Sequence, residues 1–132
     1  MNVDLSPDQQ AIRDSVREFA REQVAPGAAE RDQTAEFPVE LVKQCAEMGL
    51  MGVSIPTEWE GAGLDSVSYA LVVEELSAAC ASVGVIVSVN NSLACEPILD
   101  WGTDEQKKKY LTELASGRLL GAYAPSEPEA GS

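Results

Sequence analysis

The sequence predicts an all-α fold: an up-and-down helical bundle, followed at the C-terminus by the first strand of a β domain. Apolar residues recur at helical spacing in several segments, which are bounded by glycine, proline or capping residues. Residues 6–9 and 103–106 both have the pattern of a capping box, which begins a helix. An apolar run at 119–124 follows the last helix and resembles a strand. We expect a helical domain at 1–118 and the start of a β domain at 119–132, which the chain leaves incomplete.

The first helix is expected to begin at Ser6, the N-cap, with Pro7 in the first helical position and Gln9 closing the capping box. The pair Pro26-Gly27 is expected to bend or break this helix, with helical character resuming over 28–32. Its apolar face consists of Ile12, Val16, Phe19, Ala20 and Val24.

A second helix is expected to open at Phe37-Pro38 and to end at Gly49, a residue type that commonly terminates helices. An apolar passage at 50–56 and a glycine-bearing loop at 57–63 follow. The buried face of the helix is predicted to consist of Leu41, Val42, Cys45 and Met48.

Asp65 or Ser66 caps the third predicted helix. The next segment, 82–101, begins with β-branched residues that a strand would also favour, but its length favours a largely buried helix with a kink or break near Pro97. The buried face of the third helix is predicted to consist of Tyr69, Val72, Val73, Leu76 and Cys80.

The last helix is predicted to start at the capping box Thr103–Gln106 and to end near Ser116-Gly117. Its buried residues are expected to be Tyr110, Leu111 and Leu114, while Trp59 and Trp101 are expected to be packing residues elsewhere.

The charge balance excludes several classes of function. The chain has 9 basic and 22 acidic side chains and a net charge of -13, which repels nucleic acid and anionic membrane surfaces. No apolar run looks long enough to cross a bilayer. The chain has no histidine, which excludes Ser-His and Cys-His catalysis and most zinc sites, so no metal site is predicted.

Cysteine usage and the N-terminus bear on location. Cys45, Cys80 and Cys95 are far apart and form no CxxC pattern, which indicates buried, reduced thiols in an intracellular protein. The first eight residues have neither the basic nor the apolar region of a signal peptide, so a cytoplasmic location is expected.

Four segments in the same order give the chain a resemblance to the acyl-CoA dehydrogenase family over essentially its whole length. In that family a Pro-x-x-x-Gly-Gly-x-Gly loop joins the second and third long helices, and Glu60 stands where the first glycine of the pair is common. The sequence Ser-Val-Asn-Asn-Ser-Leu at 88–93 is similar to the short-chain (butyryl) branch. Residues 102–111 fit the family pattern Gly-[Ser/Thr]-x-x-Gln-Lys, and residues 123–132 look like its flavin-binding signature.

The resemblance implies a flavoenzyme of fatty acid β-oxidation that uses FAD to oxidise a short-chain acyl-CoA to the 2,3-enoyl-CoA. A carboxylate takes the α-proton, the β-hydride goes to flavin N5, and electrons pass to an electron-transferring flavoprotein. The family has an N-terminal helical domain, a middle β domain and a C-terminal helical domain, usually in a homotetramer. Its catalytic glutamate lies in the C-terminal domain, so no catalytic residue is assigned here and the chain alone is expected to be inactive.

The resemblance also implies binding residues. Ser126 takes the position whose hydroxyl meets the pyrimidine edge of the flavin, and Ser132 takes a position near the pyrophosphate and the acyl-CoA. Ile86, Val87 and Asn90 align with the helix face at the closed end of the acyl pocket. The residues that align with the flavin-contacting segment are Tyr123, Ala124, Pro125, Ser126, Gly131 and Ser132.

The sequence departs from the family pattern at one position of the flavin-contacting segment. Pro125 stands where the family usually has leucine or valine, and proline lacks the backbone N–H that this segment would offer the flavin. The hypothesis is that FAD binds more weakly or that the turn has moved.

Two alternatives stay open. The segment 63–67, followed by an acidic helix, resembles an acyl carrier protein, in which Ser66 would take phosphopantetheine. The chain could also be a non-catalytic helical fragment or assembly module, whose strand at 119–124 would be an unpaired edge that promotes association.

Overall fold

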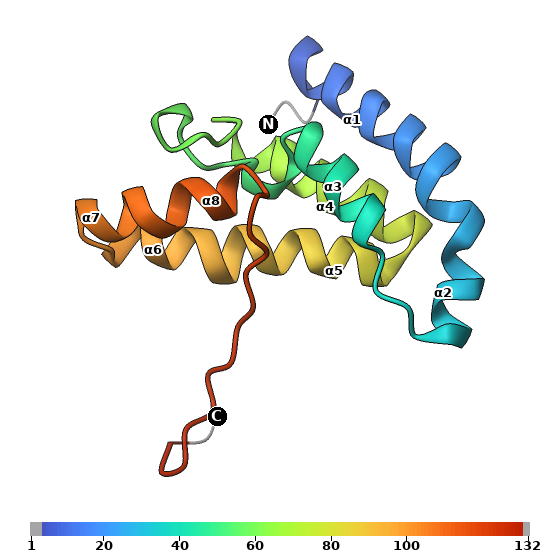
Figure 1. Cartoon of the computed structure of the whole chain (residues 1–132). Helices are drawn as coiled ribbons and strands as arrows, with labels where there is room; N and C mark the ends of the chain where they lie inside the picture. Colours follow the sequence, from blue (N-terminus) through green and yellow to red (C-terminus); the bar gives the residue numbers. More distant parts are fainter. Residues whose placement is uncertain (1–3, 131–132) are drawn as a thin grey trace.

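The computed structural model describes residues 4–130, and this range is helical, with no strand assigned within it. Long helices cross one another to form the body of the molecule, and the chain then leaves it as an extended segment (Figure 1). The all-α prediction is confirmed.

The first helical stretch begins at the predicted capping box. The Ser6 hydroxyl accepts a hydrogen bond from the backbone N–H of Gln9 (3.2 Å), and the Gln9 side chain accepts one from the backbone N–H of Ser6 (3.0 Å). The expected disturbance at Pro26-Gly27 takes the form of a 3-10 turn, after which the helix resumes. In chain order the stretch consists of α1 (Pro7–Phe19), the π-helical η1 (Ala20–Val24), the 3-10 turn η2 (Ala25–Gly27) and α2 (Ala28–Thr34).

The second helix, α3 (Val39–Glu47), ends as predicted at Gly49, which has a φ of 75°. The apolar passage that follows is buried, because its short 3-10 turn η3 (Leu50–Gly52) runs between α3 and the last helices. A third 3-10 turn, η4 (Thr57–Trp59), forms the start of the glycine-bearing loop.

The third helix, α4 (Ser66–Ala79), is capped by Asp65, whose carboxylate accepts a hydrogen bond from the backbone N–H of Ser68 (2.7 Å). The chain turns at Cys80 into a continuous helix that does not break at Pro97. The proline lies in the first turn of α6, where a missing N–H is tolerated. This helix consists of α5 (Ala81–Val89), the π-helical η5 (Asn90–Cys95) and α6 (Glu96–Trp101).

Because it continues through Pro97, this 21-residue helix is long and apolar enough to cross a membrane, with a mean hydropathy of 1.3. No apolar run of this length was expected from the sequence, in which a kink or break was predicted near Pro97. Within the described range no other helix is both long and apolar enough to cross a membrane. In the helix of residues 81–101, 39% of the apolar window is buried inside the molecule. Its Asn90 and Asn91 are buried and hydrogen-bonded to neighbouring segments, as in the core helix of a folded domain.

The last helical stretch begins with the second predicted capping box, formed by Thr103 and Gln106. Leu111 is buried as predicted, but Tyr110 is 44% exposed, because adjacent helical residues point about 100° apart and only one of the two faces the core. Trp101 is 87% exposed at the end of α6 and is not a packing residue, whereas Trp59 packs against the core. The stretch consists of α7 (Asp104–Gln106), the π-helical η6 (Lys107–Leu111) and α8 (Thr112–Ala115).

The predicted strand at 119–124 is absent. The segment is extended but has no strand partner in the described range, and a strand is defined by the hydrogen bonds it makes to a neighbour. The β-type pairing found in residues 4–130 is one isolated bridge between Glu127 and Ala130 at the tip of the projecting segment.

The core has two parts. A larger cluster lies between α1, α3, α4 and α5, and includes Val16, Val72 and Val87. A smaller cluster joins Ile55 and Cys95 to residues of the last helical stretch. The point at which the C-terminal segment leaves the body lies beside η5, which contributes to the smaller cluster.

Candidate functional site

The candidate site is the segment that projects from the body after α8. The backbone N–H of Leu119 donates to the carbonyl of Glu113 (3.0 Å), and that of Gly121 donates to Oδ1 of Asn90 (2.8 Å). Beyond Gly121 the described part of the segment makes no hydrogen bond to the helical body. Figure 1 shows it running straight away from the helices.

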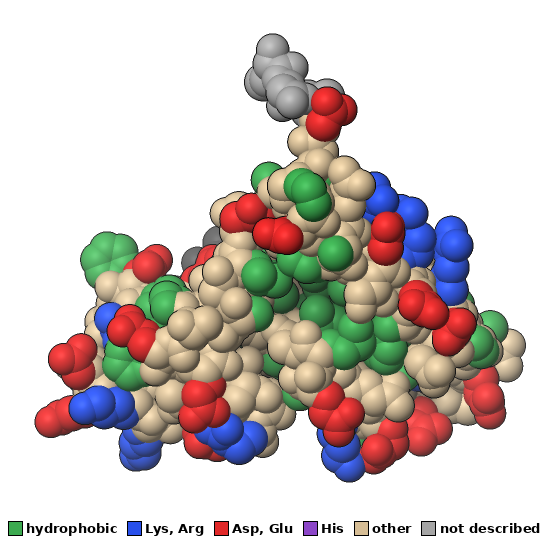
Figure 2. All heavy atoms as spheres, turned by 90° about the horizontal axis from the view of Figure 1, so that it is seen from above, with side chains coloured by type: hydrophobic (Ala, Val, Ile, Leu, Met, Phe, Trp, Pro, Cys, Tyr) green, Lys and Arg blue, Asp and Glu red, His purple; other side chains and the backbone are tan. Residues whose placement is uncertain are grey.

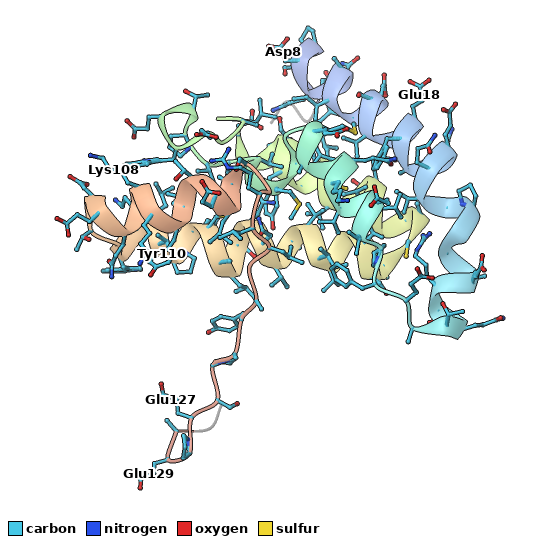
Figure 3. All side chains as sticks on the ribbon, in the orientation of Figure 1. Asp8, Glu18, Lys108, Tyr110, Glu127 and Glu129 are labelled. Carbon is cyan, nitrogen blue, oxygen red and sulfur yellow. The ribbon has the colours of Figure 1, made fainter. Side chains whose placement is uncertain are left out.

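The four central residues predicted to contact flavin lie together on this segment and are all exposed. Tyr123 is 55% exposed, and Ala124, Pro125 and Ser126 follow it in extended chain. Beyond them a tight turn is closed by two backbone hydrogen bonds between Glu127 and Ala130, of 2.9 and 3.2 Å. Figure 3 shows the labelled Glu127 and Glu129 at this tip, far from the helices. The predicted residues Gly131 and Ser132 lie outside the described residues.

The chemistry of the segment fits one edge of a flavin. Tyr123 and Ser126 carry hydroxyl groups, and the backbone from 122 to 126 makes no hydrogen bond to another part of the described chain. Such groups can meet the ring nitrogens and carbonyls of a flat polar cofactor. Pro125 is the exception, because it offers no N–H. The segment supplies one side of a binding site, and the described helices do not enclose it.

The three residues predicted at the acyl pocket do not converge on one cavity. Val87 is fully buried in the larger core cluster, and Asn90 is fully buried beside η3 and α8. Ile86 is partly buried and lines a groove of about 770 Å³. That groove lies between α2, the loop 35–38 and the start of α5, and it includes no residue of the projecting segment. A role at an acyl pocket therefore stays a prediction for all three.

Asn90 holds three separate segments together. Its Nδ2 donates to the carbonyls of Met51 (2.7 Å) and Leu114 (3.0 Å), and its Oδ1 accepts from Gly121. These contacts join η3, α8 and the projecting segment to η5. The sequence suggested a substrate contact for Asn90, whereas the structure shows a side chain whose polar groups are occupied within the protein.

The neighbouring Asn91 was not singled out in the sequence analysis. Its Oδ1 accepts from the backbone N–H of Val53 (2.7 Å), and its Nδ2 donates to the carbonyls of Leu50 (2.8 Å) and Val87 (2.9 Å). It ties the apolar passage around η3 to α5. The available signal was an Asn-Asn pair inside an apolar helix, since a buried amide requires partners.

Apolar side chains are exposed on the surface near the projecting segment. On the face opposite to the side from which the segment leaves, Figure 2 shows further apolar side chains gathered at the centre, with acidic side chains around them. The exposed apolar residues at the start of the segment are Leu119, Leu120 and Tyr123.

Comparison with known proteins decides the family. The family described as acyl-CoA dehydrogenase, N-terminal domain, matches residues 6–118. The chain belongs to this family. The matched range includes Ser66, which is exposed as the first residue of α4. This family match sets aside the interpretation of the chain as an acyl carrier protein.

Named relatives of this family are similar over nearly the whole chain. The chain is 47% identical to the short-chain specific acyl-CoA dehydrogenase of Clostridium acetobutylicum, over 99% of this chain and 35% of that protein. It is 45% identical to the mitochondrial short-chain specific acyl-CoA dehydrogenase of Bos taurus, over 99% of this chain and 32% of that protein. The chain thus spans about a third of the length of these relatives.

Solved structures agree with the fold. The butyryl-CoA dehydrogenase of Megasphaera elsdenii has a TM-score of 0.89 and 34% identity, over 99% of this chain and 35% of its own. A chain in a structure described as the electron transferring flavoprotein of Acidaminococcus fermentans has a TM-score of 0.93 and 43% identity, over 99% of this chain and 34% of its own. Both place the helices of this chain in an acyl-CoA dehydrogenase-type N-terminal domain.

Proposed function

We propose that the protein carrying this chain is an FAD-dependent acyl-CoA dehydrogenase that oxidises short-chain acyl-CoA to 2,3-enoyl-CoA and passes the electrons to an electron-transferring flavoprotein. The observation that carries the proposal is the 45–47% identity, over 99% of this chain, to two proteins whose names state short-chain specificity. The names of the matching structures, a butyryl-CoA dehydrogenase and an electron transferring flavoprotein, support the substrate and the electron acceptor.

The residues of this chain contribute binding and orientation. Tyr123 and Ser126 stand exposed on the projecting segment, where their hydroxyls and the nearby backbone N–H groups are free to meet one edge of the flavin. When bound, FAD would accept the hydride removed from the acyl chain. A donor at the position of Ser126 stabilises negative charge on the ring. No residue of this chain is assigned a proton-transfer role.

Pro125 defines a second part of the proposal. Its missing N–H lowers the number of backbone donors along the segment. Pro125→Leu, assayed for FAD affinity in the holoprotein, is expected to bind FAD more tightly. Unchanged affinity removes the concern that Pro125 weakens the site.

Assembly and location are further proposals. A homotetramer would cover apolar side chains that are exposed in this chain, including Val85 and Trp101. A cytoplasmic location is supported by the three cysteines, which are free within the described chain.

The test is a visible absorption spectrum of the purified protein, followed by anaerobic titration with acyl-CoA. A flavin spectrum that is bleached by butyryl-CoA, and less by octanoyl-CoA, is the expected result. The Ser126→Ala variant should retain bleaching but bind FAD more weakly, while Ser126→Thr should resemble the parent. A protein that binds no flavin, or that is bleached only by long-chain substrates, contradicts the proposal.

A further inference from the structure

We propose that Asn90 is a positioning residue: its buried side-chain amide fixes the point from which the flavin-facing segment leaves the helical body. The inference rests on the proposed function, because it assigns Asn90 to the cofactor segment and not to the acyl pocket. It predicts that Asn90 controls FAD affinity without touching the cofactor.

The geometry leaves the amide one orientation. An asparagine side chain offers two N–H donors on one side and an oxygen acceptor on the other. The Nδ2 of Asn90 faces the carbonyls of Met51 and Leu114, at 2.7 and 3.0 Å. A flipped amide would present its oxygen to two carbonyls and its N–H groups to another N–H. The correct orientation therefore places Oδ1 in front of the Gly121 N–H, at 2.8 Å.

Close packing at Gly121 is a second, independent observation. A Cβ added to Gly121 would lie 2.3 Å from the Cβ of Ala94 and 3.3 Å from Oδ1 of Asn90. The backbone of the segment thus passes so near to η5 that a side chain does not fit without displacing it. Steric fit and the hydrogen bond hold the same residue in the same place.

The contact matters because of its position in the chain. It is the final hydrogen bond between the segment and the helices in the described range, and Tyr123 follows two residues later. If the contact is lost, the residues that face the flavin start from an unfixed point. Cofactor binding must then order them, and ordering a flexible segment lowers affinity.

Asn91 supplies a matched control. It is the next residue, it is also buried, and its amide makes three hydrogen bonds. None of these bonds reaches the projecting segment, since they go to Leu50, Val53 and Val87. Removing either amide leaves buried polar groups unpaired, so both variants should lose stability. Only the loss of Asn90 should free Gly121.

The experiment compares Asn90→Ala and Asn91→Ala in the complete holoprotein by two measurements. Hydrogen–deuterium exchange at the Gly121 amide reports the contact, and the dissociation constant of FAD reports its consequence. Asn90→Ala should speed exchange at Gly121 and raise the dissociation constant about tenfold, which corresponds to one buried hydrogen bond. Asn91→Ala should change the dissociation constant by less than about twofold at a temperature where both variants are folded.

Gly121→Ala covers the case in which Asn90→Ala does not fold. The added methyl group would clash with Ala94 and displace the segment, while the Asn90 amide stays intact. This variant should therefore also raise the FAD dissociation constant. Equal losses of FAD affinity in Asn90→Ala and Asn91→Ala, or unchanged exchange at Gly121 in Asn90→Ala, would overturn the inference. If the parent protein binds no FAD, the proposed function fails, while exchange at Gly121 still decides whether Asn90 holds the segment.

Discussion

Glu60 adopts a left-handed backbone conformation, with a φ of 61°, in the loop before α4. Residues with a side chain rarely adopt this conformation, which explains why glycine is common at this place in the family pattern. The glutamate adds a contact that glycine lacks. Its carboxylate accepts a hydrogen bond from Arg118 (2.6 Å), and Arg118 also donates to Glu113 (2.9 Å). Glu60 thus links the loop to the segment after α8.

A pair of substitutions separates the backbone of Glu60 from its side chain. Glu60→Gly and Glu60→Ala both remove the contact with Arg118, but only the alanine variant keeps a Cβ in the left-handed conformation. The glycine variant should therefore be more stable by about 1 kcal/mol, as measured by urea unfolding. Equal stability of the two variants would show that the loop relaxes away from this conformation.

The three thiols should differ in reactivity. Burial raises the pKa of Cys45 to about 11 and that of Cys95 to about 12, so both stay protonated near neutral pH. Burial also opposes ionisation of Cys80, but the backbone N–H of Val83 and the Arg31 guanidinium outweigh it and lower the pKa of this thiol. The native protein should therefore react with iodoacetamide first at Cys80.

Mass spectrometry of the labelled protein checks this order. Arg31→Gln should slow labelling of Cys80, because it removes one of the groups that stabilise the thiolate. Labelling of Cys45 or Cys95 before Cys80 would contradict the assignment.

At this scale the sequence predicted residue types better than residue roles. Gln9 and Gln106 were correctly predicted to close capping boxes, because a capping box depends on neighbours three residues apart. The substrate contact expected for Asn90 stays a prediction, and the hydrogen bonds of this residue were not predicted. Its partners Met51 and Leu114 are distant in sequence, so no local pattern indicates them.

The helical elements are continuous where the sequence suggested interruptions. Pro97 lies in the first turn of α6, directly after the π-helical η5, and the helix continues through it. Apolar periodicity and caps predicted where helices begin and end, but not the π-helical segments η1, η5 and η6. A π-helical turn shifts the helix face, so the burial predicted for Tyr110 from regular helical spacing was wrong for this reason as well.

The second capping box gives a prediction at the scale of an element. Thr103 Oγ1 accepts from the backbone N–H of Gln106 (3.3 Å) at the start of α7. Thr103→Ala should lower the free energy of unfolding by about 1 kcal/mol, while Thr103→Ser should change it little. Urea denaturation measures both. A Thr103→Ala variant as stable as the parent would mean that another group satisfies this N–H.

In the whole molecule, a helical body carries an extended segment that it does not enclose. The family match ends at residue 118, next to the end of α8 and to Gly117, which has a φ of 76°. The proposed domain boundary at 118 stays a prediction that both observations support. The strand predicted at 119–124 requires a partner strand, and hydrogen bonding between strands is a property of the sheet, not of one segment.

The segment is exposed because the helical body does not enclose it. Leu119, Leu120 and Tyr123 place apolar surface in solvent, which a folded domain normally covers. Under the proposed function, bound FAD would cover part of this surface.

The most direct test of the account is hydrogen–deuterium exchange of the complete protein, stripped of FAD and then reloaded with it. The account predicts that FAD slows exchange in residues 122–130, where the segment is exposed, while the buried helical core around Val72 and Val87 changes little. If FAD binds without slowing exchange in this segment, the segment does not contact the flavin and the central claim is wrong.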